Sequence, residues 1–195
     1  FNGCSRLVDV NFEDGKEVLS FYHSSGDYPV YFKGCPIRKL YIGRTIDHWS
    51  NPAFDLSNTL EIKIGPYVKS LDYYLLKGAS KISSLRIPAS VTYLGKGAFD
   101  GCVSLKSVIF EDGTNTLVYT CGHGSVRPGG GIVNYDMFCD SPLNYVYIGR
   151  NLKVHQGYSY IGSIFALSPI TKIDISGSVT ELVDLSSLDK LQEIN

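Results

Sequence analysis

One pattern of apolar residues returns along the chain about every two dozen positions, and this periodicity constrains the fold more than any other feature. The clearest unit begins at Ile82 and begins again at Leu105, 23 residues later. Each complete copy places apolar residues at the fourth and sixth positions of a six-residue core and, except for Thr59, at the first position. The copies are Leu7/Val10/Phe12, Ile37/Leu40/Ile42, Thr59/Ile62/Ile64, Ile82/Leu85/Ile87, Leu105/Val108/Phe110, Leu143/Val146/Ile148, Ile170/Ile173/Ile175 and a partial copy at Leu191/Ile194. A fixed period of this length indicates a stack of repeated structural units.

Within each copy the last two apolar positions alternate with an outward residue, which is the periodicity of a β-strand. A Gly, Pro, Ser or Glu follows the strand and turns the chain away. A Phe-x-Gly-Cys corner leads into the next strand at 1–4, 32–35 and 99–102. A single such coil cannot bury its own apolar edge, so the pattern predicts coils that stack on one another.

The segment IPASVTYLGKGAFDGC at 87–102 resembles the leucine-rich repeat of BspA-type surface proteins of Bacteroides and treponemes. The resemblance covers nearly the whole chain, is strongest at 81–112 and is weak at 66–80 and 176–190. It implies a leucine-rich repeat solenoid, a right-handed β/α superhelix that is rich in β-structure. A parallel sheet would line the concave face, and short helical or irregular segments would form the convex side. Members of the family are exported, often attached to the cell surface, and associated with adhesion.

We expect a single domain over 1–195 with about eight coils. Residues 1–19 match residues 99–117, and Tyr-Ile-Gly-Arg at 41–44 returns at 147–150. These echoes predict a duplicated block, 1–98 and 99–195, although convergence on one repeat consensus is an alternative. The second block would carry two longer loops, Gly113–Met137 and Asn151–Ser163. The partial copy at the end predicts that the chain is a fragment of a longer array.

Charge and hydrophobicity exclude some classes of protein. Eighteen basic and nineteen acidic residues leave a net charge of -1. A protein that binds nucleic acid by neutralising phosphates normally has a basic excess, so we expect no nucleic-acid partner. No apolar run is long enough for a transmembrane span. With the resemblance, the Tyr- and Gly-rich composition predicts an extracellular protein, secreted or attached to the bacterial surface.

The sequence contains no recognisable catalytic or metal-binding motif, so we expect no enzyme, no cofactor and no metal. The five cysteines (Cys4, Cys35, Cys102, Cys121 and Cys139) form no C-x-x-C pair and are interpreted as buried structural thiols. Cys121 lies near His123, but no third group that could orient the histidine is evident. The acidic turns Glu13-Asp14 and Glu111-Asp112 are interpreted as Asp-Gly turns, with calcium binding as an alternative.

The outward positions of the predicted strands form the candidate binding surface. Its middle part is basic and aromatic, and Tyr and Arg are enriched at binding hot spots. A plain solvated sheet surface is the alternative. If the surface binds, its charge favours an acidic protein segment or an anionic glycan. We therefore predict a non-enzymatic adhesion module that binds a protein ligand, either a host matrix protein or a bacterial surface protein. The alternative is a glycan-binding or accessory module of a surface polysaccharide-utilisation system or of a larger enzyme. The candidate binding residues are Arg38, Lys39, Tyr41, Lys63, Arg86, Lys106, Tyr145 and Tyr147.

Overall fold

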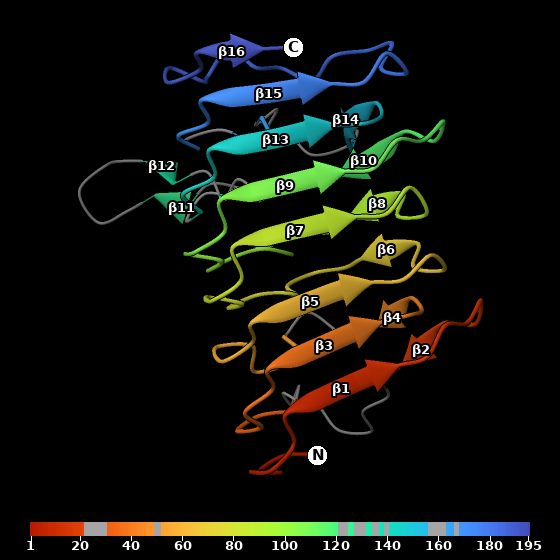
Figure 1. Cartoon of the computed structure of the whole chain (residues 1–195). Coiled ribbons are helices and arrows are strands. Elements are labelled where there is room, and N and C mark those ends of the chain that lie inside the picture. Colours follow the sequence, from red (N-terminus) through yellow and green to blue (C-terminus); the bar gives the residue numbers. More distant parts are fainter. Residues whose placement is uncertain are drawn as a thin grey trace.

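The computed structural model is a stack of coils that places one parallel strand per coil on a common face (Figure 1). It describes residues 1–21, 31–48, 52–120, 125–126, 132–133, 137–138, 141–155, 163–165 and 168–195. Within these residues the strands of the common face are β1 (Asp9–Phe12), β3 (Lys39–Ile42), β5 (Glu61–Ile64), β7 (Ser84–Ile87), β9 (Ser107–Phe110), β13 (Tyr145–Ile148), β15 (Lys172–Ile175) and β16 (Glu193–Ile194). Each of these strands lies on one of the predicted apolar repeats, so the predicted repeat fold is confirmed.

A second row of short strands follows the first six face strands, one in each of their coils. It consists of β2 (Leu19–Ser20), β4 (Ile46–Asp47), β6 (Ser70–Leu71), β8 (Tyr93–Leu94), β10 (Leu117–Tyr119) and β14 (Leu152–Val154), and the pairs are parallel. Short helical or irregular segments were expected on this side of the coils, and the described residues contain no helix. Two predicted loops are also corrected, because β10 lies within 113–137 and β14 within 151–163. Apolar residues of these segments, such as Leu117 and Leu152, are buried in the core, as the apolar residues of the other strands are.

Most of the rest of the 113–137 loop lies outside the described residues. Its described residues include a small antiparallel pair, β11 (Ser125–Val126) and β12 (Ile132–Val133), which lies to one side of the stack (Figure 1).

Register places like residues of successive coils in columns inside the stack. Leu85 pairs with Val108, Val108 with Val146, and Val146 with Ile173, and all of these side chains are buried. The aromatic corner residues form two further stacks. Phe32 lies between Phe1 and Phe54, with both ring centroids 5.0 Å away. The second stack comprises Phe99, Phe138 and Phe165, with centroid distances of 5.0 and 6.2 Å. Apolar burial along these columns is the main force that holds the coils together.

The face sheet is interrupted between β5 and β7. Strands β1, β3 and β5 form one sheet, and β7, β9, β13, β15 and β16 form another. The residue after each strand commonly donates its N–H to the preceding coil, as Gly65 does to Ile42 O and Gly149 to Phe110 O. After β7 this position is Pro88, which has no N–H to donate. Pro88 therefore removes one hydrogen bond from the contact between the coils of β5 and β7.

The described cysteines are structural, as predicted, with one exception. Cys35 and Cys102 are buried, whereas Cys4 is exposed; none of the three forms a disulfide. The Cys35 thiol donates to Phe1 O at 2.9 Å and the Cys102 thiol to Leu76 O at 3.6 Å, so each contacts the corner of the preceding coil. Burial raises the pKa of Cys102 to about 12. Cys121 and Cys139 lie outside the described residues.

This arrangement predicts selective thiol chemistry. Because thiolate is the reactive form, iodoacetamide should modify Cys4 of the native protein and leave Cys35 and Cys102 unmodified until the chain is unfolded in urea. Peptide mass spectrometry of alkylated samples measures each cysteine separately. Modification of Cys102 in native protein as fast as Cys4 would contradict the structural role.

Candidate ligand-binding face

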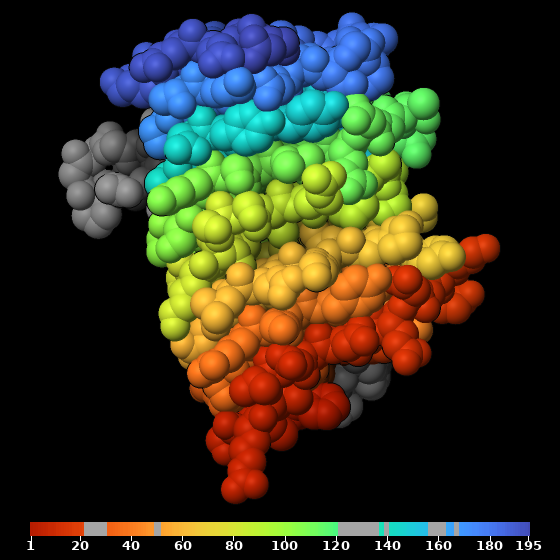
Figure 2. All heavy atoms as spheres, viewed as in Figure 1, coloured from red at the N-terminus to blue at the C-terminus, as the bar shows by residue number. Residues whose placement is uncertain are grey.

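The outward side chains of the face strands form one continuous surface, here called the sheet face, along the stack (Figure 2). Lys39 and Tyr41 lie on β3, Lys63 on β5, Arg86 on β7, and Tyr145 and Tyr147 on β13. Arg38 and Lys106 are exposed and come directly before β3 and β9. The structure therefore places all eight candidate residues on the sheet face or at its edge.

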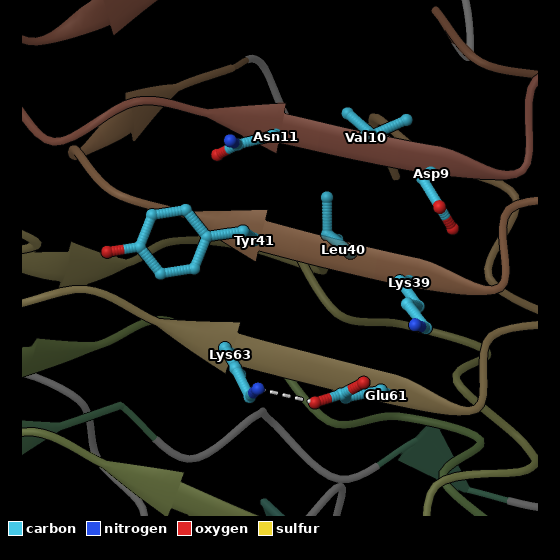
Figure 3. Close-up of a pocket in the computed structure, with 8 residues that line it drawn as sticks. All are labelled: Asp9, Val10, Asn11, Lys39, Leu40, Tyr41, Glu61 and Lys63. Carbon is cyan, nitrogen blue, oxygen red and sulfur yellow. Dashed lines mark ion pairs between the residues drawn. The ribbon is translucent and has the colours of Figure 1, made fainter.

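A groove of about 300 Å³ lies over β1, β3 and β5. It brings together three of the eight predicted residues, and the other five do not line it. Strand register sets Asp9 beside Lys39 and Lys39 beside Glu61, with Asn11, Tyr41 and Lys63 forming the next row. Figure 3 shows the two rows on successive strands, with the Tyr41 ring extending beyond the end of β3. The lining residues are Asp9, Val10, Asn11, Lys39, Leu40, Tyr41, Glu61 and Lys63.

Charges on the sheet face are balanced locally, which changes the expected ligand. Lys63 pairs with Glu61 at 2.7 Å, and Arg86 pairs with Glu111 at 3.2 Å. The hydrogen bond and charge of Lys63 lower the pKa of Glu61, and Lys39 adds to this effect, so the carboxylate stays ionised. The predicted preference for an anionic ligand rested on the basic residues alone. Because acids lie beside these bases, the groove has no excess of positive charge.

Aspartates hold the tyrosines of the sheet face in fixed orientations. The Tyr41 hydroxyl donates to Asp14 Oδ1 at 2.6 Å, and the Tyr147 hydroxyl donates to Asp112 at 2.9 Å. Tyr145 donates to Asp174 at 2.8 Å. The hydrogen bond to Asp14 raises the pKa of Tyr41, so the phenol remains a donor. A tyrosine that is already fixed loses little conformational freedom when a ligand contacts its ring.

Sequence reasoning missed these Tyr–Asp contacts. It interpreted Asp14 and Asp112 as turn residues, with calcium binding as the alternative, although each turn recurs with a Tyr-Ile-Gly-Arg segment in the following coil. The joint recurrence of the acidic turn and the Tyr-Ile-Gly-Arg segment was the sequence signal that could have indicated the Tyr–Asp contacts. In the structure Gly65, directly after β5, leaves room for the Tyr41–Asp14 contact, since a Cβ on Gly65 would lie 2.7 Å from both Asp14 Oδ1 and the Tyr41 hydroxyl.

No group of three or more His, Cys, Asp or Glu side chains in the described part of the chain is placed to hold a metal ion. The calcium alternative gains no support, because the Asp14 and Asp112 carboxylates accept hydrogen bonds from tyrosines. The Cys121–His123 pair lies outside the described residues.

A parallel strand that recurs once per coil, with apolar residues at fixed positions facing a shared core, defines the leucine-rich repeat solenoid. Residues 28–123 match six copies of the family described as the BspA type leucine rich repeat region. Strands β13 and β15 lie beyond the matched residues but continue the same register. No curated protein and no solved structure matched the chain.

Repeats of this family are typical of protein-interaction and surface modules, and the family is usually surface-associated or extracellular. Among the described residues the structure has no helix with the length and apolar character needed to cross a membrane.

Proposed function

We propose that this chain is a non-enzymatic adhesion module of a bacterial cell surface and that its sheet face binds a protein ligand. The observation that carries the proposal is the groove over β1, β3 and β5. Its side chains project from a rigid sheet, and two of them, Tyr41 and Glu61, are oriented by neighbouring groups at 2.6 and 2.7 Å. Groups held in place before binding lower its entropic cost.

The groove also combines the chemistry of protein recognition sites. It has an aromatic ring, the aliphatic stems of two lysines, and charged groups of both signs. Aromatic anchors within a polar rim are typical of protein interfaces. The family supports a binding role, and the adhesion setting and the protein ligand are the parts we propose.

The test is a double variant, Lys39→Ala with Tyr41→Ala, compared with Lys153→Ala on β14 as a control away from the sheet face. Immobilised collagen, laminin and fibronectin, a purified bacterial surface-protein panel and a glycan array are the probes. We expect the double variant to weaken binding to a protein probe by at least about ten-fold, as for loss of a hot-spot residue, while Lys153→Ala binds as the parent does. Circular dichroism should show both variants folded.

Unchanged binding of the double variant to a protein that the parent binds would refute a role for the groove. Binding of the parent to glycans alone would favour the glycan-binding alternative.

A further inference from the structure

A row of alternating charges crosses the groove. Asp9, Lys39 and Glu61 are the first residues of β1, β3 and β5, and parallel pairing places them side by side. The row therefore presents negative, positive and negative groups in order (Figure 3). Lys63 contacts Glu61 from the same strand at 2.7 Å and holds its carboxylate in place.

The spacing of the row selects the conformation of a matching ligand. Neighbouring strands lie about 4.8 Å apart, so the row spans about 9.6 Å. On an α-helix, residues i, i+4 and i+7 share a face and span about 10.5 Å. On an extended strand three successive residues of one face span about 13 Å, which overshoots the row. A helix lying across the strands fits the row best.

The sheet face also leaves room for such a helix to continue. The first residues of the next two face strands are Ser84 and Ser107, whose side chains are small, and the following strand, β13, begins with Tyr145. Ser107 pairs with Ser84 on one side and Tyr145 on the other. Beyond the charged row, the helix would therefore pass over two serines before it meets the Tyr145 ring.

We infer that the groove binds an amphipathic helix of a protein partner that presents positive, negative and positive side chains at i, i+4 and i+7. These charges are complementary to Asp9, Lys39 and Glu61, and the inference rests on the proposed function. Matching charges across an interface determine which partner and register are accepted. The helix lays one face on the sheet, as helices do in other recognition grooves.

The experiment uses three fluorescent alanine-based helical peptides of equal length. One carries Lys, Glu and Lys at i, i+4 and i+7, the second carries Glu, Lys and Glu, and the third has the composition of the first with its charges on different faces. Fluorescence anisotropy at low salt should show the first binding the parent chain about ten-fold tighter than either of the others. High salt should shrink the difference, because exposed charges are screened.

A charge-swapped chain, Asp9→Lys with Lys39→Glu and Glu61→Lys, should reverse the preference between the first two peptides. Lys39→Glu alone is a second variant that should lose the preference, and Lys153→Glu on β14 should keep it. Circular dichroism checks the folding of each.

Equal binding of the three peptides, or an unchanged preference in the charge-swapped chain or in Lys39→Glu, would overturn the inference. A glycan that competes for the groove would overturn it as well. The double variant Lys39→Ala with Tyr41→Ala keeps the two hypotheses apart. If it abolishes binding to a protein probe although the peptides fail these tests, the proposed function stands and the helical ligand is rejected.

Discussion

Replacing Arg150 with alanine is expected to lower the free energy of unfolding by about 3 kcal/mol. Arg150 has no exposed surface and is among the largest fully buried side chains. Its guanidinium donates to Ala89 O at 2.5 Å and to Pro88 O at 2.8 Å. Arg150 follows β13 and its two acceptors follow β7, so the side chain crosses the intervening coil of β9 and joins three coils.

Two effects contribute to the expected loss, because alanine leaves a cavity and deprives two carbonyls of charged donors. A third effect partly offsets them, since alanine also removes a buried charge whose desolvation is unfavourable. Burial lowers the pKa of Arg150 to about 10, so the guanidinium remains charged at neutral pH and part of the hydrogen-bond gain is offset. Arg150→Met should lower the free energy of unfolding less than Arg150→Ala does, because methionine fills most of the volume. It should still lower it, because the two carbonyls have no donor.

Arg44 is a matched control. It follows Tyr41-Ile42-Gly43 as Arg150 follows Tyr147-Ile148-Gly149, yet it is only half-buried and donates to Glu13 O at 2.9 Å. Arg44→Ala should therefore cost less than about 1 kcal/mol. Urea unfolding followed by circular dichroism measures both variants. Equal losses at the two positions would show that Arg150 does not hold the coils together.

Gly149→Ala is expected to lower the free energy of unfolding by about 2 kcal/mol or more, since overpacking against backbone is poorly tolerated. A Cβ at Gly149 would lie 2.4 Å from Phe110 O and 2.5 Å from Asp112 N. These are backbone atoms of the preceding coil and cannot rotate away. The methyl group would push the coils of β9 and β13 apart and lengthen the bond from Gly149 N–H to Phe110 O, which is 2.9 Å.

The matched control is Gly177→Ala, because a Cβ at Gly177 would meet no atom within 4 Å. We expect it to change stability by less than about 0.5 kcal/mol. Gly43→Ala should resemble Gly149→Ala, since its Cβ would lie 2.5 Å from Phe12 O. Thermal and urea unfolding of the three variants checks the ranking. A small loss for Gly149→Ala would mean that the coils can separate locally at little cost.

The repeat period was readable from the sequence because each coil solves the same packing problem. Leu85, Val108 and Val146 occupy one buried column, and the spacing of these residues along the chain reveals it. The second row of strands was harder to predict. Segments such as Leu152–Val154 are only three residues long, and their β-structure depends on a neighbouring coil that supplies hydrogen bonds. The duplication into 1–98 and 99–195 stays a prediction, although Tyr41–Asp14 and Tyr147–Asp112 are matching contacts.

The candidate surface was predicted residue by residue but not as an arrangement. Alternation along a strand is local, so Lys39 and Tyr41 could be assigned to the outward face from the sequence. Their partners come from other coils, since Asp14 is 27 residues from Tyr41 and Glu61 is 22 residues from Lys39. Asp9 and Glu61 were also assigned to the outward face, but only the register of the strands places them on either side of Lys39.

By itself, the sequence determined that the chain forms stacked coils with a parallel strand in each, because a repeated apolar pattern can be buried only by repeating the same contact. Only the tertiary structure decided where the face sheet is interrupted, which coils Arg150 joins, and that the groove is balanced in charge. These properties depend on which coil lies beside which and in what register. Side chains far apart in sequence then meet within hydrogen-bonding distance, and their mutual charge and packing fix the chemistry of the surface.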